Sequence, residues 1–208
     1  MDNLILVGGG GHCKSVIDVA ECAGYNIVGI LDKPEEFQKE ILGYYVIGAD
    51  CDAVKYIDTC EFMISVGQVK SVALRIRLYH MLKDMNACLA TVIAPLAHVS
   101  RHASIGEGSI VLNNAVVNAD VRIGCNAIIN TASVIEHEVK IGDFCHVSTG
   151  AIVNGNCRIG DRVFVGSQCV CKNGINICSD VIVGAGSTVL ADICEAGVYA
   201  GSPAKRLR

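Results

Sequence analysis

Hydrophobic and polar positions follow two different patterns along the chain, and the change falls near Pro95. Up to residue 94, short apolar runs alternate with segments in which apolar residues recur at helical spacing. The runs 3–7, 25–32 and 61–67 predict strands, 12–24 and 71–86 predict helices, and 87–94 is a closing apolar segment. Strand–helix–strand order of this kind predicts a Rossmann-like α/β domain with a parallel sheet over residues 1–94.

The second pattern has a period of six. From residue 99 to residue 189 a Val or Ile returns every six positions, sixteen times with Cys171 as the one exception, and a small or slender residue follows four positions later. This repeat predicts a parallel β-helix over residues 95–208, in which three hexads make one coil and residues 18 apart stack. Cys145, Cys157 and Cys169 occupy the small inward position, so we interpret them as core residues rather than metal or redox groups.

The positions just before each large aliphatic residue form three outward columns. The first column is apolar apart from one histidine, the second is apolar, and the third is polar. In order, they contain Ile110, Ile128, His146, Phe164 and Ile182; Val116, Val134, Ile152, Val170 and Thr188; and Ser104, Arg122, Lys140, Arg158, Asn176 and Cys194. Two apolar outer faces indicate subunit contacts, and two different faces that meet must close as a ring, of which a trimer is the simplest.

One hexad stands out because a histidine lies between two glutamates, in SVIEHEVK at residues 133–140. His137 falls at a corner of the coil, where a lone histidine is ordinarily just solvated. Three features favour catalysis instead. Glu138 can hydrogen-bond one ring nitrogen and raise the basicity of the other, as a general base requires. Gly155, stacked one coil on, has a bare backbone N–H that could approach an acyl oxygen, and His146 lies on the first apolar column.

Composition narrows the class of protein. The net charge is −4 with no basic block, which argues against nucleic acid as the main partner. No apolar run is long enough to span a membrane, and the first residues lack the pattern of a signal peptide. The twelve cysteines are scattered without CxxC pairs, which is typical of reduced thiols and predicts a cytoplasmic protein.

A glycine run, VGGGGHCKS at residues 7–15, lies between the first predicted strand and helix. Backbone N–H groups at such a place can bind a phosphate, although many glycine loops bind nothing. Read as G-x-G-x-x-G, the run has Gly8 and Gly10 but Cys13 in place of the last glycine. Asp32, at the end of the second predicted strand, could bind a ribose hydroxyl.

The hexad array, the closing VYAGSPAKRLR and the leading VGGGGH together resemble the left-handed β-helix acyltransferases. More closely, the chain is similar to the sugar acetyltransferases of the sialic acid O-acetyltransferase and PglD-type N-acetyltransferase group, most specifically in SVIEHE and IGDFCHVS. The resemblance implies a left-handed coil, although the general rule for β crossovers favours the right hand. It also implies a homotrimer that uses acetyl-CoA to acetylate a nucleotide-linked amino sugar, such as a UDP-4-amino-4,6-dideoxy sugar, for bacterial surface glycans.

The resemblance further implies roles for individual residues. His137 would deprotonate the acceptor amine, Glu138 would tune it, with Glu136 as the weaker candidate, and His146 would contact acetyl-CoA. Ser167 and Ala185 would line the coenzyme groove, Gly155 would also bind the coenzyme, and residues 201–205 would close near the adenine end. The nucleotide-sugar is expected at Gly10, Gly11, His12, Asp32, Lys33 and Gly67. Lys33 replaces the second acid common in the relatives and Gln68 replaces their asparagine, which leaves the base and the sugar open.

Three other functions stay open. The same base could serve an O-acetyltransferase acting on a sugar or sialic acid hydroxyl. A zinc-dependent β-helix hydratase needs three converging protein ligands, but only His137 and His146 are well placed, since His98 and His102 lie two or more coils earlier. A nucleotide-binding regulator without catalysis would not need the His–Glu pair. We therefore predict an N-acetyltransferase that uses acetyl-CoA and no metal.

Overall fold

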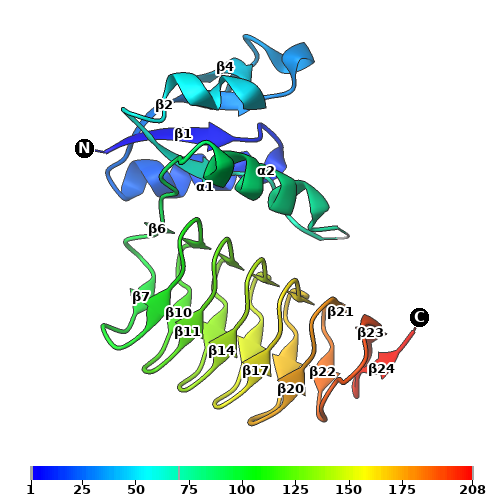
Figure 1. The fold of residues 1–208 in the computed structure, drawn as a ribbon. Helices are drawn as coiled ribbons and strands as arrows, with labels where there is room; N and C mark the ends of the chain where they lie inside the picture. The colour runs from blue at the N-terminus through cyan, green and yellow to red at the C-terminus, as the bar shows by residue number, and fades with distance from the viewer. Residues whose placement is uncertain (1, 70, 208) are drawn as a thin grey trace. The chain divides into compact units, whose positions relative to one another are not determined.

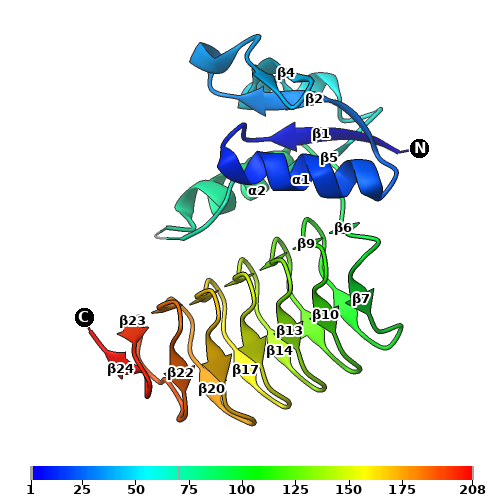
Figure 2. The ribbon, with the colours of Figure 1, turned by 180° about the vertical axis from the view of Figure 1, so that it is seen from behind.

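The computed structural model describes residues 2–69 and 71–207, which form two compact units, Met1–Ala94 and Pro95–Arg208 (Figures 1 and 2). The first unit is the expected α/β fold and the second is the expected left-handed parallel β-helix. Among the described residues, no helix combines the length and the apolar character that crossing a bilayer requires.

The first unit has a five-stranded sheet in the order β3-β4-β2-β1-β5. Its strands are β1 (Asn3–Val7), β2 (Asn26–Asp32), β3 (Glu40–Ile41), β4 (Tyr44–Ala49) and β5 (Glu61–Ile64); the helices are α1 (Gly11–Cys22), α2 (Ala73–Asp84) and two 3₁₀ turns, η1 (Pro34–Glu36) and η2 (Asp50–Lys55); and β6 (Val92–Ile93) follows. All pairings are parallel except β3 with β4. Helix α1 buries Val16, Ile17 and Ala20, which are the apolar positions that predicted it.

Two parts of this unit were not predicted. No element was predicted over residues 33–60, but they contain the β3–β4 hairpin, whose link has positive φ at Leu42 and Gly43. The segment 87–94 forms no complete strand in the sheet, since only Leu89 makes an isolated parallel bridge to Phe62. The β3–β4 pairing covers two residues and the bridge at Leu89 is isolated, so both leave little hydrophobic periodicity. Strand β4 itself has six residues with alternating burial, and it was missed.

The second unit is built mostly from two-residue strands, which stack in three sheets (Figure 1). The sheet of the first column contains β9 (Ile110–Val111), β12 (Ile128–Ile129), β15 (His146–Val147), β18 (Phe164–Val165), β21 (Val181–Val183), β23 (Gly197–Ala200) and β24 (Lys205–Arg206). The sheet of the second contains β7 (His98–Val99), β10 (Val116–Val117), β13 (Val134–Ile135), β16 (Ile152–Val153), β19 (Val170–Cys171) and β22 (Thr188–Val189). The sheet of the third contains β8 (Ser104–Ile105), β11 (Arg122–Ile123), β14 (Lys140–Ile141), β17 (Arg158–Ile159) and β20 (Asn176–Ile177).

The predicted stacking is confirmed with one correction. Residues 18 apart pair in parallel, as Ile128 does with His146 and Val134 with Ile152. In the last coil, however, Ile177 bridges to Ile193, 16 residues on. Placing Cys194 in the third column was therefore wrong, because this coil is two residues short and Asp192 follows Asn176 instead.

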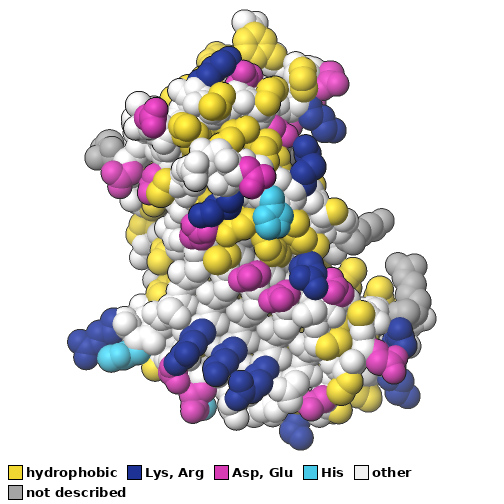
Figure 3. Space-filling model, in the orientation of Figure 1, with side chains coloured by type: hydrophobic (Ala, Val, Ile, Leu, Met, Phe, Trp, Pro, Cys, Tyr) yellow, Lys and Arg dark blue, Asp and Glu magenta, His cyan; other side chains and the backbone are white. Residues whose placement is uncertain are grey.

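The interior and the three outer faces differ in burial. The large aliphatic and small inward residues form one core, and Cys145, Cys157 and Cys169 are fully buried in it, as predicted. The third column is exposed, and Figure 3 shows a row of Lys and Arg side chains on this part of the surface. The second column is half-buried. The first column differs from expectation, because Ile110 and Ile128 are already fully buried in the single chain.

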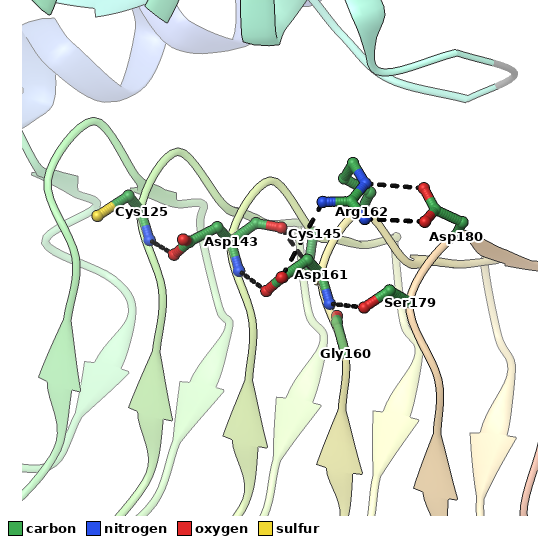
Figure 4. A network of polar contacts seen from close by, with 8 residues as sticks. All are labelled: Cys125, Asp143, Cys145, Gly160, Asp161, Arg162, Ser179 and Asp180. Atoms are coloured by element: carbon green, nitrogen blue, oxygen red, sulfur yellow. Dashed lines mark hydrogen bonds and ion pairs between the residues drawn. The ribbon is translucent and has the colours of Figure 1, made fainter. Parts of the chain in front are cut away.

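A ladder of hydrogen bonds joins successive coils at the corner that follows the third column (Figure 4). The backbone N–H of Cys125 donates to Asp143 Oδ1 at 2.7 Å, that of Asp143 donates to Asp161 Oδ1 at 2.9 Å, and that of Asp161 donates to Ser179 Oγ at 3.0 Å. Each side chain thus caps a backbone donor of the preceding coil that the two-residue strands leave outside the sheet.

Candidate active site

His137 and Glu138 form the corner between β13 and β14. Glu138 adopts the left-handed conformation, with φ at 62°, so the chain turns between the two strands at this pair. The ring Nδ1 of His137 lies 2.9 Å from Oε2 of Glu138, and both side chains are 59% exposed. When Nδ1 carries the ring proton and donates a hydrogen bond to the carboxylate, Nε2 carries a lone pair, as a general base needs.

Gly155 lies one coil further along and supports the His137 ring. A Cβ at this position would lie 2.7 Å from Cε1 and 2.8 Å from Nε2 of His137, so only glycine leaves room for the ring. The backbone N–H of Asn156 also donates to the carbonyl of His137 at 2.9 Å. Only the N–H of Gly155 was predicted to matter, and the contact of this residue with the ring was not predicted.

The two glutamates that flank His137 have different partners. Glu138 contacts the imidazole, whereas Oε2 of Glu136 accepts a hydrogen bond from Nδ2 of Asn118 at 2.8 Å. Asn118 lies one coil before Glu136, at the same position of the hexad. Sequence reasoning missed it, although the 18-residue stacking would have placed the two side chains together.

His146 has a different setting on β15. Its side chain is 5% exposed, its Nε2 lies 3.0 Å from Nδ2 of Asn130, and its ring packs against Phe164 in a T-shaped arrangement with centroids 5.1 Å apart. Phe164 was predicted to stack next in this column, but Asn130 was missed. It lies 16 residues before His146, a diagonal that the 18-residue stacking does not single out.

Ser167 and Ala185 stack at a different corner from His137. Each follows a strand of the first column, β18 and β21 respectively. Ser167 Oγ is 2.9 Å from Ser148 Oγ, and Ala185 is exposed. Beyond them the tail folds back, because Ser202 Oγ donates to Thr188 Oγ1 at 3.0 Å. The two expected coenzyme residues therefore lie together, one coil apart.

In the first unit, the glycine loop lies where β1 ends and α1 begins. Gly8 has φ at 107°, and a Cβ there would be 2.3 Å from Cγ2 of Val66, so this position requires glycine. The N-cap of α1 is Gly10, which has no side chain to bond the first N–H groups of the helix. Such a helix start is suited to bind an anion.

The carboxyl ends of β1, β2 and β5 meet around this loop, at the edge where parallel sheets bind ligands. Asp32, at the end of β2, accepts the N–H of Gly9 through Oδ2 and the N–H of Lys33 through Oδ1, both at 2.8 Å. Asp32 thus holds the loop in place, a role that the sequence did not reveal. After β5, Gly67 lies against His12, since a Cβ on Gly67 would be 3.3 Å from Cβ of His12.

Arg75 of α2 holds the loop after β5 and was not predicted. Its buried Nη1 donates to the carbonyls of Ile64, at 3.1 Å, and Val66, at 2.5 Å. Burial lowers the pKa of its guanidinium to about 9. Burial likewise raises the pKa of the Cys13 thiol to about 11, so this cysteine beside the glycine loop is a poor nucleophile.

No group of three or more His, Cys, Asp or Glu side chains within residues 2–69 and 71–207 is arranged to hold a metal ion. The arrangement therefore offers a histidine base with a carboxylate partner, a second and buried histidine, and a separate loop suited to phosphate.

Known proteins match this chain along its whole length. The PglD N-terminal domain family matches residues 3–82. The acetyltransferase domain of PglB from Neisseria gonorrhoeae is 31% identical, with a TM-score of 0.92 over 100% of both chains, and it is also solved with acetyl coenzyme A. PerB from Caulobacter crescentus, solved with CoA and GDP-perosamine, is 31% identical, with a TM-score of 0.91 over 99% of this chain and 97% of its own.

A search of curated protein sequences found no significant match. WeeI from Acinetobacter baumannii shares the fold at 21% identity, with a TM-score of 0.87 over 100% of both chains. The identity to the two enzyme structures, over both units of the chain, shows that the chain belongs to the PglD-type family of sugar N-acetyltransferases.

Proposed function

We propose that this protein transfers the acetyl group of acetyl-CoA to the amine of a nucleotide-linked amino sugar. The observation that carries the proposal is the His137–Glu138 corner, held over Gly155, in a chain that matches sugar N-acetyltransferases from end to end. Relatives solved with acetyl coenzyme A and with GDP-perosamine support the two substrate classes.

His137 acts as the general base. Its Nε2 removes a proton from the sugar amine as the amine nitrogen attacks the thioester carbonyl, and Glu138 stabilises the resulting imidazolium. When the C–S bond breaks, His137 can return the proton to the departing CoA thiolate, so no covalent enzyme intermediate is needed. A positioned base of this kind accelerates a reaction by about 10²–10⁴, and the rest comes from holding amine and thioester together.

The other predicted residues take supporting roles in this proposal. The N–H groups at Gly10 and Gly11 bind the diphosphate of the nucleotide, while His12, Asp32, Lys33 and Gly67 surround its sugar and base. His146, Gly155, Ser167 and Ala185 line the path of acetyl-CoA along the β-helix. The exposed start of α1, with no side-chain cap, supports the first part, and the stacking of Ser167 with Ala185 supports the second.

We also propose that the active protein is a homotrimer in the cytoplasm. The second column supports the trimer, because it leaves a stripe of aliphatic side chains half-exposed along the β-helix. The twelve cysteines are all free, including exposed ones such as Cys22 and Cys51, which supports a reducing compartment.

The experiment that tests the function is a substrate screen. Purified protein and acetyl-CoA would be mixed with UDP-, dTDP- and GDP-linked 4-amino sugars, and separately with free sialic acid. CoA release would be followed with a thiol reagent and the product by mass. We expect acetylation of one nucleotide-linked amine. Activity on sialic acid alone would replace N-acetylation with O-acetylation, and no CoA release with any acceptor would overturn the proposal.

A further inference from the structure

Asn130 is held from several sides at the end of β12. Its backbone N–H donates to the carbonyl of Val147 at 2.9 Å, and its carbonyl accepts the hydroxyl of Ser133 at 2.7 Å. Its side-chain Oδ1 accepts the backbone N–H of Thr131 at 2.7 Å, and its Nδ2 lies 3.0 Å from Nε2 of His146. The amide therefore has one fixed orientation between a backbone donor and an imidazole.

This orientation determines the proton on His146. A backbone N–H can only donate, so the amide atom that faces Thr131 is the oxygen, and the NH₂ group faces His146. An amide NH₂ can also only donate, so Nε2 of His146 must accept and must carry a lone pair. A neutral imidazole has one N–H, which then lies on Nδ1. We infer that Asn130 is a positioning residue that fixes His146 as the neutral tautomer protonated at Nδ1.

The two histidines of the site are thereby prepared for opposite tasks. Glu138, a carboxylate, stabilises positive charge on His137, whereas a proton on Nε2 of His146 would point at the NH₂ of Asn130. When the environments of two titratable groups favour different protonation states, the two groups can be assigned different roles. The T-shaped contact with Phe164, at 5.1 Å, also fixes the plane of the His146 ring. His146 is thus a hydrogen-bond donor through Nδ1 and not a second base.

The consequence for catalysis rests on the proposed function. If His146 contacts acetyl-CoA, its neutral ring can do so without releasing a proton to the acceptor amine. A neutral donor leaves His137 as the one group that exchanges a proton with the amine. Replacing Asn130 by Asp should reverse this arrangement, because Asp can still accept the Thr131 N–H but presents a second acceptor to His146. The imidazole proton would then move to Nε2, or the ring would gain a second proton.

The test is the tautomer itself, read by NMR. The protein would be labelled with ¹⁵N-histidine, and long-range ¹H–¹⁵N correlations would identify which ring nitrogen bears a proton. The chain has six histidines, and the signals of His146 would be assigned from their loss in His146→Gln. In the wild-type protein we expect an unprotonated Nε2 that correlates with both ring protons, and in Asn130→Asp a protonated Nε2. Asn114→Asp, at an exposed left-handed turn position, is the matched control and should leave the His146 signals unchanged.

A protonated Nε2 in the wild-type protein would overturn the inference, and this reading does not depend on the folding of Asn130→Asp. An unchanged tautomer in a folded Asn130→Asp would overturn it as well. Kinetics then separate it from the proposed function. The changed protonation of the His146 ring should raise the KM for acetyl-CoA in Asn130→Asp roughly 2- to 10-fold, with the KM for the sugar unchanged. A switched tautomer with unchanged acetyl-CoA kinetics would uphold the inference about Asn130 and reject the contact of His146 with the coenzyme.

Discussion

Oε2 of Glu138 lies 2.9 Å from Nδ1 of His137, while Glu136, on the other side of the same histidine, is bound by Asn118. Two glutamates equally close in sequence thus have unequal access to the imidazole, because only Glu138 occupies the left-handed turn position that bends the chain back toward the ring. Glu138 is therefore the residue that can tune the base, whereas Glu136 links two adjacent coils through Asn118.

The His–Glu pair gives the first prediction. His137→Ala should lower kcat by about 10²–10⁴, the usual contribution of a positioned base, with the KM for acetyl-CoA little changed. Glu138→Gln should lower kcat by a smaller factor, about tenfold or more, because the imidazolium loses its carboxylate. Steady-state kinetics would measure both, and Glu136→Gln is the matched control that should retain most activity. Full activity in His137→Ala would reject its role as the base.

Gly155 gives the second prediction. In Gly155→Ala the new methyl group would lie 2.7 Å from Cε1 of His137, so the ring must move while the buried core stays intact. A displacement of about 1 Å can cost roughly 10² in rate, so we expect kcat to fall about 10- to 100-fold with the thermal midpoint nearly unchanged. Asn173→Ala, one coil further at the same corner, is the control. An unchanged kcat in Gly155→Ala would mean that the observed ring position is not the catalytic one.

Contacts between residues one full coil apart could be predicted from the sequence, whereas a diagonal contact and the register of the last coil could not. The hexad period places Ile128 over His146 and His137 over Gly155, because a repeating coil converts sequence distance directly into spatial distance. It does not reveal the diagonal contact of Asn130 with His146. The short last coil was also missed, since Val189 is the last member of the repeat and nothing after it fixes the register.

In the first unit the position of the glycine run between strand and helix could be predicted from the sequence, but its internal hydrogen bonds could not. The glycine run follows β1 and Asp32 ends β2, as predicted. Whether Asp32 faces solvent or binds the backbone depends on the close approach of Gly9, which only the folded loop determines. The role of Arg75 could not be predicted either, because a helical arginine is ordinarily a surface residue.

Asp32 gives the third prediction. Asp32→Asn leaves one amide oxygen for two backbone N–H donors, those of Gly9 and Lys33, so one donor must face an NH₂ group. An unsatisfied donor costs about 1–3 kcal/mol, and the loop should shift. We expect the KM for the nucleotide-sugar to rise about tenfold or more, with the KM for acetyl-CoA within about twofold of wild type. Asp58→Asn, on the exposed surface of the same unit, is the control, and equal changes in both KM values would contradict a role confined to the nucleotide.

The fourth prediction concerns the pH dependence of stability at the β-helix corner (Figure 4). Arg162 binds Asp180 through two hydrogen bonds, at 2.7 and 2.8 Å, and these lower the pKa of the Asp180 carboxyl. A carboxyl whose pKa is lower in the folded state contributes stability above its unfolded pKa, about 3.9, and that stability is lost as the pH falls through the folded pKa.

Asp180→Asn should therefore destabilise the protein at pH 7 and not at low pH. The pair is partly exposed, so the expected loss is only about 0.2–1 kcal/mol. Urea unfolding at pH 7 and near pH 3 would measure the difference between wild type and variant, which should shrink at the lower pH. Asp120→Asn is the control, because Asp120 lies 3.7 Å from Arg122 between two exposed side chains. A loss that is equal at both pH values would show that charge is not the cause.

The fifth prediction concerns assembly and uses the second column. Its aliphatic side chains are half-buried in one chain, so contact with another subunit would remove further apolar surface from water, at about 25 cal/mol per Å². Sedimentation equilibrium should give three times the chain mass of 21.9 kDa for the wild type. Ile152→Asp should dissociate the trimer, because it would bury an unpaired charge in the contact. Ile128 is unsuitable for this test, since it is fully buried in the single chain and its replacement would damage the fold itself. Arg158→Asp, on the exposed third column, changes the charge of the same coil and should leave the trimer intact. A monomeric wild-type protein, or dissociation by both variants alike, would contradict an interface on the second column.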